Sequence, residues 1–294
     1  MKSLTQVRWC GVALMVLLVA ACFFPVLGFD FVRWDDDITV TQNPMMTEPW
    51  SWGLAADFFD PKAAMRFKPI HWFFMRGLYE VDGLNPLVFH AAGLVLHTFA
   101  AVLLFLVLAM VFRLCFPAVT SNYLELMAWL GAALWAIHPL RVEPVAWVTG
   151  STYPLTGVFL LGSFLAYLNS QLSVKPSSAW LVGAWLGAVM AYGTYPVSVT
   201  YGLWLMVADI ALFKNSPVRP FCWTDAAVRR WWLKHFLFLA PALCAVGVTV
   251  WCRLVTPGIF GAAPSLGIVT WDQRFVAALA TLAIFPFKFF GLHI

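Results

Sequence analysis

The sequence predicts an all-α polytopic membrane protein, a bundle of about eight transmembrane helices. Its 294 residues are 62% hydrophobic and 11% charged, whereas soluble domains carry about 25% charged residues. Mean hydropathy is +0.82. Apolar runs of about 20 residues, long enough to cross a bilayer as helices, recur along the chain. These features exclude a soluble enzyme, a disordered tail and a small disulfide scaffold, and no basic stripe suits nucleic acid.

The expected spans are apolar runs separated by polar or charged connections. They cover residues 9–28, 87–112, 124–138, 155–172, 179–193, 196–213, 235–255 and 275–290. The first run has two interpretations, a cleaved signal peptide or an uncut helix, and the apolar residues that continue past Cys22 favour the uncut helix. The sequence Gly193-Thr194-Tyr195-Pro196 predicts a narrow turn between two helices.

We expect residues 1–294 to form a single membrane-embedded module. The chain stops inside apolar sequence at residues 285–294, so we expect it to be a fragment of a longer protein. The six cysteines show no regular spacing, and we interpret them as free thiols or apolar filler.

The placement of lysine and arginine predicts the orientation, because short cytoplasmic loops retain these residues. Residues 29–86 then form one long extracytoplasmic loop, whose aromatic residues predict helices lying at the membrane interface: Trp50, Trp52, Trp72, Phe73 and Phe74. We expect an integral multi-pass protein of a bacterial inner membrane with its site facing the periplasm or outside, or of the endoplasmic reticulum with a lumenal site.

Three consecutive aspartates, Asp35, Asp36 and Asp37, follow the first span. Adjacent carboxylates repel one another, and beside the membrane they are costly unless a cation or a substrate group compensates. One interpretation is a general base whose neighbouring carboxylate orients the acceptor or binds a metal; the other is a solvated acidic loop. A divalent metal on these carboxylates stays open. Because no well-spaced ligand set is present, we expect no metal and no other cofactor.

A second polar segment, His138-Pro139-Leu140-Arg141-Val142-Glu143, falls in the next extracytoplasmic turn. Arg141 has forked donors that suit a phosphate, and Glu143 suits the orientation of a substrate hydroxyl. Alternatively, Arg141 and Glu143 pair with each other and stabilise the loop. The candidate phosphate partners in the first loop and this turn are Lys68, Arg76 and Arg141.

Several motifs occur in order between residues 29 and 165. They are Phe31-Val32, Trp34-Asp35-Asp36-Asp37, Asn43-Pro44, Lys68-Pro69, Leu84-Asn85-Pro86, Phe89-His90, Leu96-His97 and His138-Pro139-Leu140-Arg141-Val142-Glu143-Pro144-Val145-Ala146-Trp147. In these motifs the chain resembles the membrane part of the transmembrane and tetratricopeptide-repeat O-mannosyltransferase family, which are polytopic glycosyltransferases with the GT-C fold.

The resemblance implies inverting transfer of a sugar from a polyprenyl-phosphate donor in the membrane to a protein or glycan hydroxyl outside the cytoplasm. It implies that Asp35 is the catalytic base and Asp36 its partner, and Arg141 and Glu143 match a second family motif. The expected catalytic residues are therefore Asp35, Asp36 and Glu143. The expected substrate-binding residues are Asp37, Lys68, Arg76, His138 and Arg141.

The chain departs from the family pattern at two places. Relatives commonly carry an arginine and an acid where Ser151-Thr152-Tyr153-Pro154 stands, and many carry Ser-Lys-Glu where Gly193-Thr194-Tyr195 stands. These departures leave the donor and the acceptor open.

A transporter, a flippase or a non-catalytic scaffold for lipid-linked substrates is the alternative function. Transporters place polar residues near the bilayer midplane on broken helices. Asp209 and the hairpin at Gly193 fit that alternative, whereas the clustering of most polar residues at one surface favours the enzyme.

Overall fold

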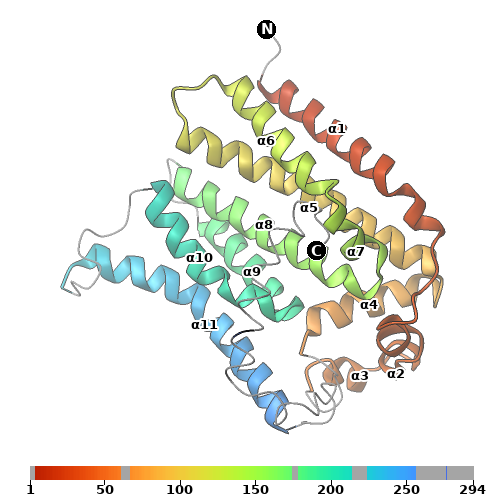
Figure 1. The fold of residues 1–294 in the computed structure, drawn as a ribbon. Coiled ribbons are helices and arrows are strands. Elements are labelled where there is room, and N and C mark those ends of the chain that lie inside the picture. Colours follow the sequence, from red (N-terminus) through yellow and green to blue (C-terminus); the bar gives the residue numbers. More distant parts are fainter. Residues whose placement is uncertain (1–3, 61–66, 174–177, 214–223, 256–275, 277–294) are drawn as a thin grey trace.

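The computed structural model describes residues 4–60, 67–173, 178–213, 224–255 and 276 (Figure 1). Every regular element within these ranges is a helix, which confirms the predicted all-α class. Five stretches are long and apolar enough to cross a membrane: Leu4–Gly28, Pro86–Cys115, Thr149–Leu172, Pro196–Phe213 and Ala226–Trp251. The chain is therefore an integral, multi-pass membrane protein.

Two more bundle helices are shorter than these spans. Helix α6 (Ser121–Ala136) has 16 residues and α9 (Ser178–Thr194) has 17. Both lie where the sequence predicted spans. The span expected at residues 275–290 falls outside the described residues, so the total of about eight spans stays a prediction.

The long helices pack on both sides of α5 (Pro86–Cys115), as Figure 1 shows. Helices α1 (Leu4–Phe23) and α6 contact α5 and each other, and α8 (Thr152–Leu172) contacts α5 and α9. Helices α10 (Tyr201–Ala208) and α11 (Ala226–Val255) contact each other, and α11 also contacts α9. Small side chains let helices approach closely in lipid. The interface of α1, α5 and α6 accordingly buries Ala101, Ala109, Ala128, Ala132 and Ala133.

Short helices gather where the long connections between the spans lie, and we call this part of the bundle the loop end (Figure 1). They are η2 (Asp37–Thr41), α2 (Pro44–Thr47), α3 (Trp52–Asp57), α4 (Pro69–Asp82), η3 (Pro139–Arg141), α7 (Val142–Ala146), η4 (Thr149–Ser151) and η5 (Pro196–Thr200). Two of the helix starts follow from Asn-Pro pairs. The side chains of Asn43 and Asn85 accept the backbone N–H groups of Met45 and Leu87, and proline fits the first helical position.

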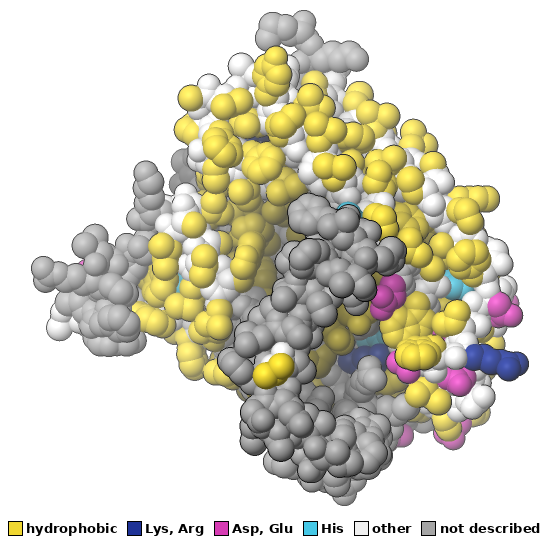
Figure 2. All heavy atoms as spheres, viewed as in Figure 1, with side chains coloured by type: hydrophobic (Ala, Val, Ile, Leu, Met, Phe, Trp, Pro, Cys, Tyr) yellow, Lys and Arg dark blue, Asp and Glu magenta, His cyan; other side chains and the backbone are white. Residues whose placement is uncertain are grey.

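The surface of the bundle is apolar. Figure 2 shows hydrophobic side chains over most of the visible bundle, while acidic and basic side chains gather near α2 to α4. Large apolar side chains are exposed on α1, α5, α6, α9 and α10, among them Leu17, Val95, Leu134, Val182 and Val207. Such a surface is unfavourable in water, so lipid is the solvent that suits these helices.

The aromatic residues of the first loop divide into two groups. Trp50, Trp52 and Phe73 are exposed, as residues at a membrane interface are expected to be. Trp72 is 1% exposed and packs in a cluster with Met46 and Phe58. The Trp72 side chain therefore lies inside the protein, while the placement of these helices at the membrane interface stays a prediction.

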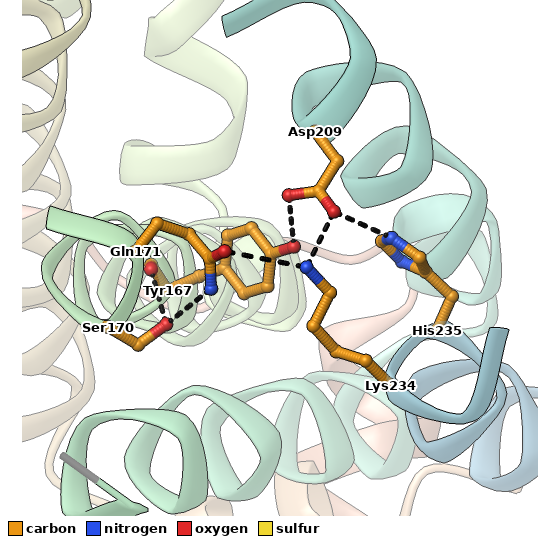
Figure 3. A network of polar contacts seen from close by, with 6 residues as sticks. All are labelled: Tyr167, Ser170, Gln171, Asp209, Lys234 and His235. Atoms are coloured by element: carbon orange, nitrogen blue, oxygen red, sulfur yellow. Dashed lines mark hydrogen bonds and ion pairs between the residues drawn. The ribbon is translucent and has the colours of Figure 1, made fainter. Parts of the chain in front are cut away.

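Buried charges fix the opposite end of the bundle, far from the loop end. Arg8 and Arg113 both form ion pairs with the buried Glu125, so they join α1, α5 and α6. Asp209 lies in η6 (Asp209–Phe213), directly after α10. Its carboxylate accepts hydrogen bonds from Tyr167 and Lys234 at 2.5 Å each and contacts His235 at 3.0 Å (Figure 3). This second network joins α8, η6 and α11.

Candidate active site at the loop end

The first loop and the connection after α6 meet at Asp36. Its Oδ1 accepts the backbone N–H of Thr149 at 2.9 Å and the Thr149 hydroxyl at 2.6 Å, and its Oδ2 accepts the backbone N–H of Val32 at 3.1 Å. Asp36 is fully buried. Because a buried carboxylate is stable only when it is hydrogen-bonded, Asp36 ties the two segments together. The contact therefore joins the aspartate segment to Thr149, which follows the second polar segment, and not to Arg141 or Glu143.

Asp35 and Asp37 have different surroundings. The half-buried Asp35 side chain makes no hydrogen bond or ion pair with any described residue, although its backbone carbonyl accepts the hydroxyl of Thr39 at 2.5 Å. The Asp37 carboxylate accepts the N–H of Ile38 at 2.8 Å at the start of η2. Among the three aspartates, Asp35 is therefore the one whose carboxylate has no hydrogen-bond or ion-pair partner within the described part of the chain.

Arg141, Glu143 and His138 do not form the expected cluster. The Arg141 guanidinium lies over the ring of Trp135, 5.2 Å from its centroid, and burial lowers its pKa. Glu143 is exposed, and it forms no ion pair with Arg141. His138 accepts the N–H of Leu140 through Nδ1 at 3.2 Å and so caps η3. The alternative interpretation of a stabilising Arg141–Glu143 pair was therefore wrong.

A cavity of about 270 Å³ lies next to the Asp36–Thr149 contact. It is lined by Phe67, Lys68, Trp147, Thr149, Thr152, Tyr153, Tyr195, Pro196, Val197 and Thr249. Lys68 supplies the charge of this lining; it is 3% exposed, and its Nζ lies 4.8 Å from the centroid of the Trp72 ring. Thr149 belongs both to the cavity wall and to the contact with Asp36. Thr149 therefore links the aspartate segment to the cavity wall.

Helix α4 sets the position of Lys68, which immediately precedes it. The helix is held at both neighbouring segments: His71 Nε2 lies 3.2 Å from Ser151 Oγ in η4, and Gly193 of α9 lies directly against Ile70. Burial, and then the nearby Lys68 ammonium, lower the pKa of His71 well below 6.5. His71 is accordingly neutral at physiological pH, and Lys68 remains the cation beside the cavity.

Arg76 is used elsewhere on α4. Its guanidinium donates to the carbonyl oxygens of Met46 at 2.9 Å and Glu48 at 2.7 Å, and it pairs with Glu80. These contacts hold the segment around α2 against α4. Arg76 does not line the Lys68 cavity. We therefore do not include it among the phosphate partners of the candidate site.

Sequence reasoning did not assign Thr149, Trp147 or Tyr153 to the site, and for Tyr195 it favoured a structural role over a substrate contact. The two tyrosine rings meet edge to face, with centroids 5.3 Å apart, and both line the cavity. The available sequence signal was that both tyrosines stand where the chain departs from the family pattern. Nothing in one sequence shows that these two places, in α8 and before η5, are neighbours in space.

No three His, Cys, Asp or Glu side chains within the described part of the chain lie together as a metal site. The expectation that the protein uses no metal stays a prediction.

Curated proteins with related sequences carry one shared name. The chain is 25% identical over 177 residues to the mouse protein O-mannosyl-transferase TMTC3, a match that covers 58% of this chain and 18% of the relative. It is 28% identical over 166 residues to mouse TMTC1, covering 54% and 17%, and 28% identical over 184 residues to human TMTC4, covering 57% and 25%. In sequence the chain is similar to these TMTC proteins.

The chain spans less than a fifth of the length of the TMTC1 and TMTC3 relatives. No family model matches, and no solved structure matches. These relatives support the resemblance to the O-mannosyltransferase family that the motifs indicate.

Proposed function

We propose that this chain is the membrane module of an inverting glycosyltransferase. It moves a sugar from a polyprenyl-phosphate donor to a hydroxyl of a protein or glycan acceptor. The observation that carries the proposal is the Asp36–Thr149 contact, which joins an acidic loop to the wall of a cavity bordered by Lys68. The names of the relatives, protein O-mannosyl-transferases, support glycosyl transfer.

The residues divide the reaction between them. Asp35 takes the proton of the acceptor hydroxyl while that oxygen attacks the anomeric carbon of the sugar. The bond between this carbon and the phosphate oxygen breaks, and polyprenyl phosphate leaves as an anion next to the Lys68 ammonium. One base suffices, because the phosphate leaves without a proton. A single displacement inverts the configuration at the anomeric carbon.

Asp36 acts in this scheme as a positioning residue and not as a second base. Its carboxylate is buried and accepts three hydrogen bonds. Asp37, His138, Arg141 and Glu143 lie on the segments around the site, and Glu143 is exposed where an acceptor approaches. We retain these four residues as candidates for acceptor or headgroup contacts.

We place the loop end outside the cytoplasm. The opposite end carries Arg8, Arg113 and Lys234, together with the exposed Arg229 and Arg230 at the start of α11. Basic residues concentrate on the cytoplasmic side of membrane proteins. The active site then faces the periplasm in a bacterial inner membrane, or the lumen in the endoplasmic reticulum.

The proposal is tested by label transfer from a panel of polyprenyl-phosphate sugars in membranes that contain the full-length protein. Asp35→Asn should lower transfer at least about 100-fold, because a positioned base contributes roughly 10²–10⁴-fold. Asp82→Asn is the matched control, because Asp82 is an exposed carboxylate of the same loop. Asp82 accepts a hydrogen bond from the Asn85 side chain, and its substitution should leave the rate of transfer unchanged. Full turnover by Asp35→Asn would remove Asp35 from the mechanism.

Transport or flipping of a lipid-linked substrate remains the second candidate, favoured by one observation. Asp209 is a fully buried carboxylate within the bundle, and buried ionisable groups in membranes often serve transport. If the purified protein in vesicles moves a polyprenyl-phosphate sugar between leaflets and shows no transfer from any donor of the panel, transport replaces the glycosyltransferase proposal.

A further inference from the structure

The cavity beside Thr149 combines two aromatic rings, several hydroxyl groups and a lysine in one lining. Tyr153 is 42% exposed and Tyr195 is half-buried, and their rings meet at 73°. Hydroxyl groups line the cavity beside these rings, and Lys68 borders it. The groove between α1 and α5 offers a contrast, because its lining is apolar apart from Arg8 and Thr98. The cavity suits a ligand with both polar and apolar faces, whereas the groove suits an acyl or prenyl chain.

The threonine hydroxyls of the cavity are oriented by the protein. Thr149 donates its hydroxyl proton to Asp36, and Thr152 donates its own to the backbone carbonyl of Thr194 at 3.3 Å. A hydroxyl that has given its proton to the protein still has a lone pair that accepts. Thr152 therefore presents an acceptor, and Thr149, whose oxygen also lies 2.5 Å from the Thr39 hydroxyl, has one further lone pair. Acceptors of this kind match the donor hydroxyls of a sugar.

Trp147 adds a donor to the same lining. Its indole N–H is buried and has no hydrogen-bond partner among the described residues. A buried donor without a partner is unfavourable by about 1–3 kcal/mol, so this N–H favours the approach of an acceptor oxygen. A sugar ring supplies acceptor oxygens next to the hydroxyls that the threonines accept.

We infer that Tyr153 and Tyr195 form the aromatic wall of a glycosyl subsite and position the sugar ring of the donor. This inference rests on the proposed function. The C–H face of a pyranose ring carries partial positive charge, and the face of an aromatic ring carries partial negative charge. The sugar ring packs against the two tyrosine rings, and the sugar hydroxyls point toward Thr149 and Thr152. The donor phosphate then lies toward Lys68.

The size of the cavity agrees with one sugar unit. Small-molecule pockets usually measure about 300–1,000 Å³, and this cavity of about 270 Å³ lies just below that range. One ring fits such a volume, whereas the prenyl chain has to extend from the cavity into the membrane. Tyr153 and Tyr195 are thus positioning residues for the sugar, and Lys68 is a partner of the phosphate.

The experiment compares the binding of two lipids to the purified full chain in nanodiscs: a polyprenyl-phosphate hexose and the bare polyprenyl phosphate. The unaltered protein should bind the hexose-bearing lipid more tightly. Tyr153→Ala or Tyr195→Ala should reduce this preference about five- to tenfold, in line with the energy of aromatic contacts, and should leave the affinity for the bare lipid unchanged. Lys68→Met should weaken the binding of both lipids.

Three further variants separate positioning from folding. Tyr153→Phe keeps the ring and should keep the preference, whereas Tyr153→Leu keeps apolar volume without a ring and should lose it. Tyr123→Ala is the control, because Tyr123 is 65% exposed on α6 at the opposite end of the bundle. Loss of binding for both lipids in the tyrosine variants would show a structural role and overturn the inference.

Failure of the inference and failure of the proposed function give different results. If the unaltered protein transfers sugar but shows no preference for the hexose-bearing lipid, or if Tyr153→Ala and Tyr195→Ala keep the preference, the glycosyl subsite is wrong and the transferase stands. If the preference exists and depends on the tyrosines while Asp35→Asn retains full transfer, the subsite stands and the catalytic role of Asp35 is wrong.

Discussion

Asp36 and Thr149 lie 113 positions apart in the sequence and are joined by two hydrogen bonds, one from the backbone N–H and one from the hydroxyl of the threonine. A second short contact, 2.5 Å between the hydroxyls of Thr39 and Thr149, supports the same junction. The segment that carries Asp36 is therefore held against the rest of the protein at this residue. It is fixed to the connection that forms the wall of the Lys68 cavity.

The first prediction concerns this junction. Thr149→Val keeps the backbone N–H but removes the hydroxyl, so it should lower the free energy of unfolding by about 1 kcal/mol and speed protease cleavage within residues 29–86. Thr149→Ser keeps the hydroxyl and should behave like the unaltered protein. Thermal unfolding in detergent and limited proteolysis measure both effects. Equal cleavage rates for the Val and Ser variants would contradict the proposed role of the hydroxyl.

The second prediction concerns the contact between α4 and α9. A Cβ atom at Gly193 would lie 2.7 Å from Cγ1 of Ile70, a branched side chain that cannot swing away cheaply. Gly193→Ala should therefore destabilise the protein by about 1–3 kcal/mol. It should also raise the KM for the donor, because α4 carries Lys68. Combining Gly193→Ala with Ile70→Ala should recover part of the loss.

Gly77 gives the matched control for this prediction. It also lies in a helix, and a Cβ there would meet no atom within 4 Å. Gly77→Ala should be neutral or stabilise by up to about 1 kcal/mol, since alanine has the higher helix propensity. Thermal unfolding of the single and double variants decides the matter. A loss for Gly77→Ala as large as for Gly193→Ala would refute the steric explanation.

The third prediction concerns pH. The pKa of the buried His71 is lowered in the folded protein, while the unfolded chain protonates this histidine near pH 6.5. Below that pH the unfolded state binds more protons, so stability is complete above about pH 6.5 and falls as the pH decreases, by at most about 1.4 kcal/mol per pH unit. His71→Gln removes this titration. The free energy of unfolding, measured between pH 7 and pH 5, should depend less steeply on pH in the variant than in the unaltered protein. Identical pH dependences would disprove the assignment.

The fourth prediction concerns the network in Figure 3. Lys234→Met leaves the fully buried Asp209 without its ammonium partner, and Asp209→Asn leaves the lysine unpaired. Each single change should destabilise the protein by about 3 kcal/mol, because an unpaired buried charge is costly. The double variant should lose clearly less than the sum. All three should keep the KM for the donor, since the network lies at the opposite end from the cavity; additive losses would exclude a coupled pair.

The membrane-spanning helices and their order along the chain follow from composition and local sequence. Apolar runs predicted the long helices α1, α5, α6, α8, α9, α10 and α11, because a membrane span must satisfy its backbone hydrogen bonds within the helix. The count of Lys and Arg in short loops predicts that the acidic loop and the second polar segment lie on one side of the membrane, and this shared side stays a prediction.

The roles of individual side chains did not follow from the sequence. Arg76 and Lys68 are eight positions apart on and before one helix, yet one binds backbone carbonyls and the other borders the cavity. Asp35 and Asp36 are neighbours, yet one is half-buried and the other is fully buried and hydrogen-bonded. Neighbouring residues of a helix or turn point in different directions, so only the surrounding packing decides their chemistry.

The sequence by itself determined that this is an all-α membrane protein with its acidic residues concentrated in one loop, because hydropathy and charge act residue by residue through the solvent. Only the tertiary structure decided that Asp36 bonds to Thr149, that Arg141 and Glu143 do not pair, and that Tyr153 and Tyr195 meet. These are contacts between segments far apart in the chain. They depend on how helices pack against one another, and a single sequence does not specify that packing through any local pattern.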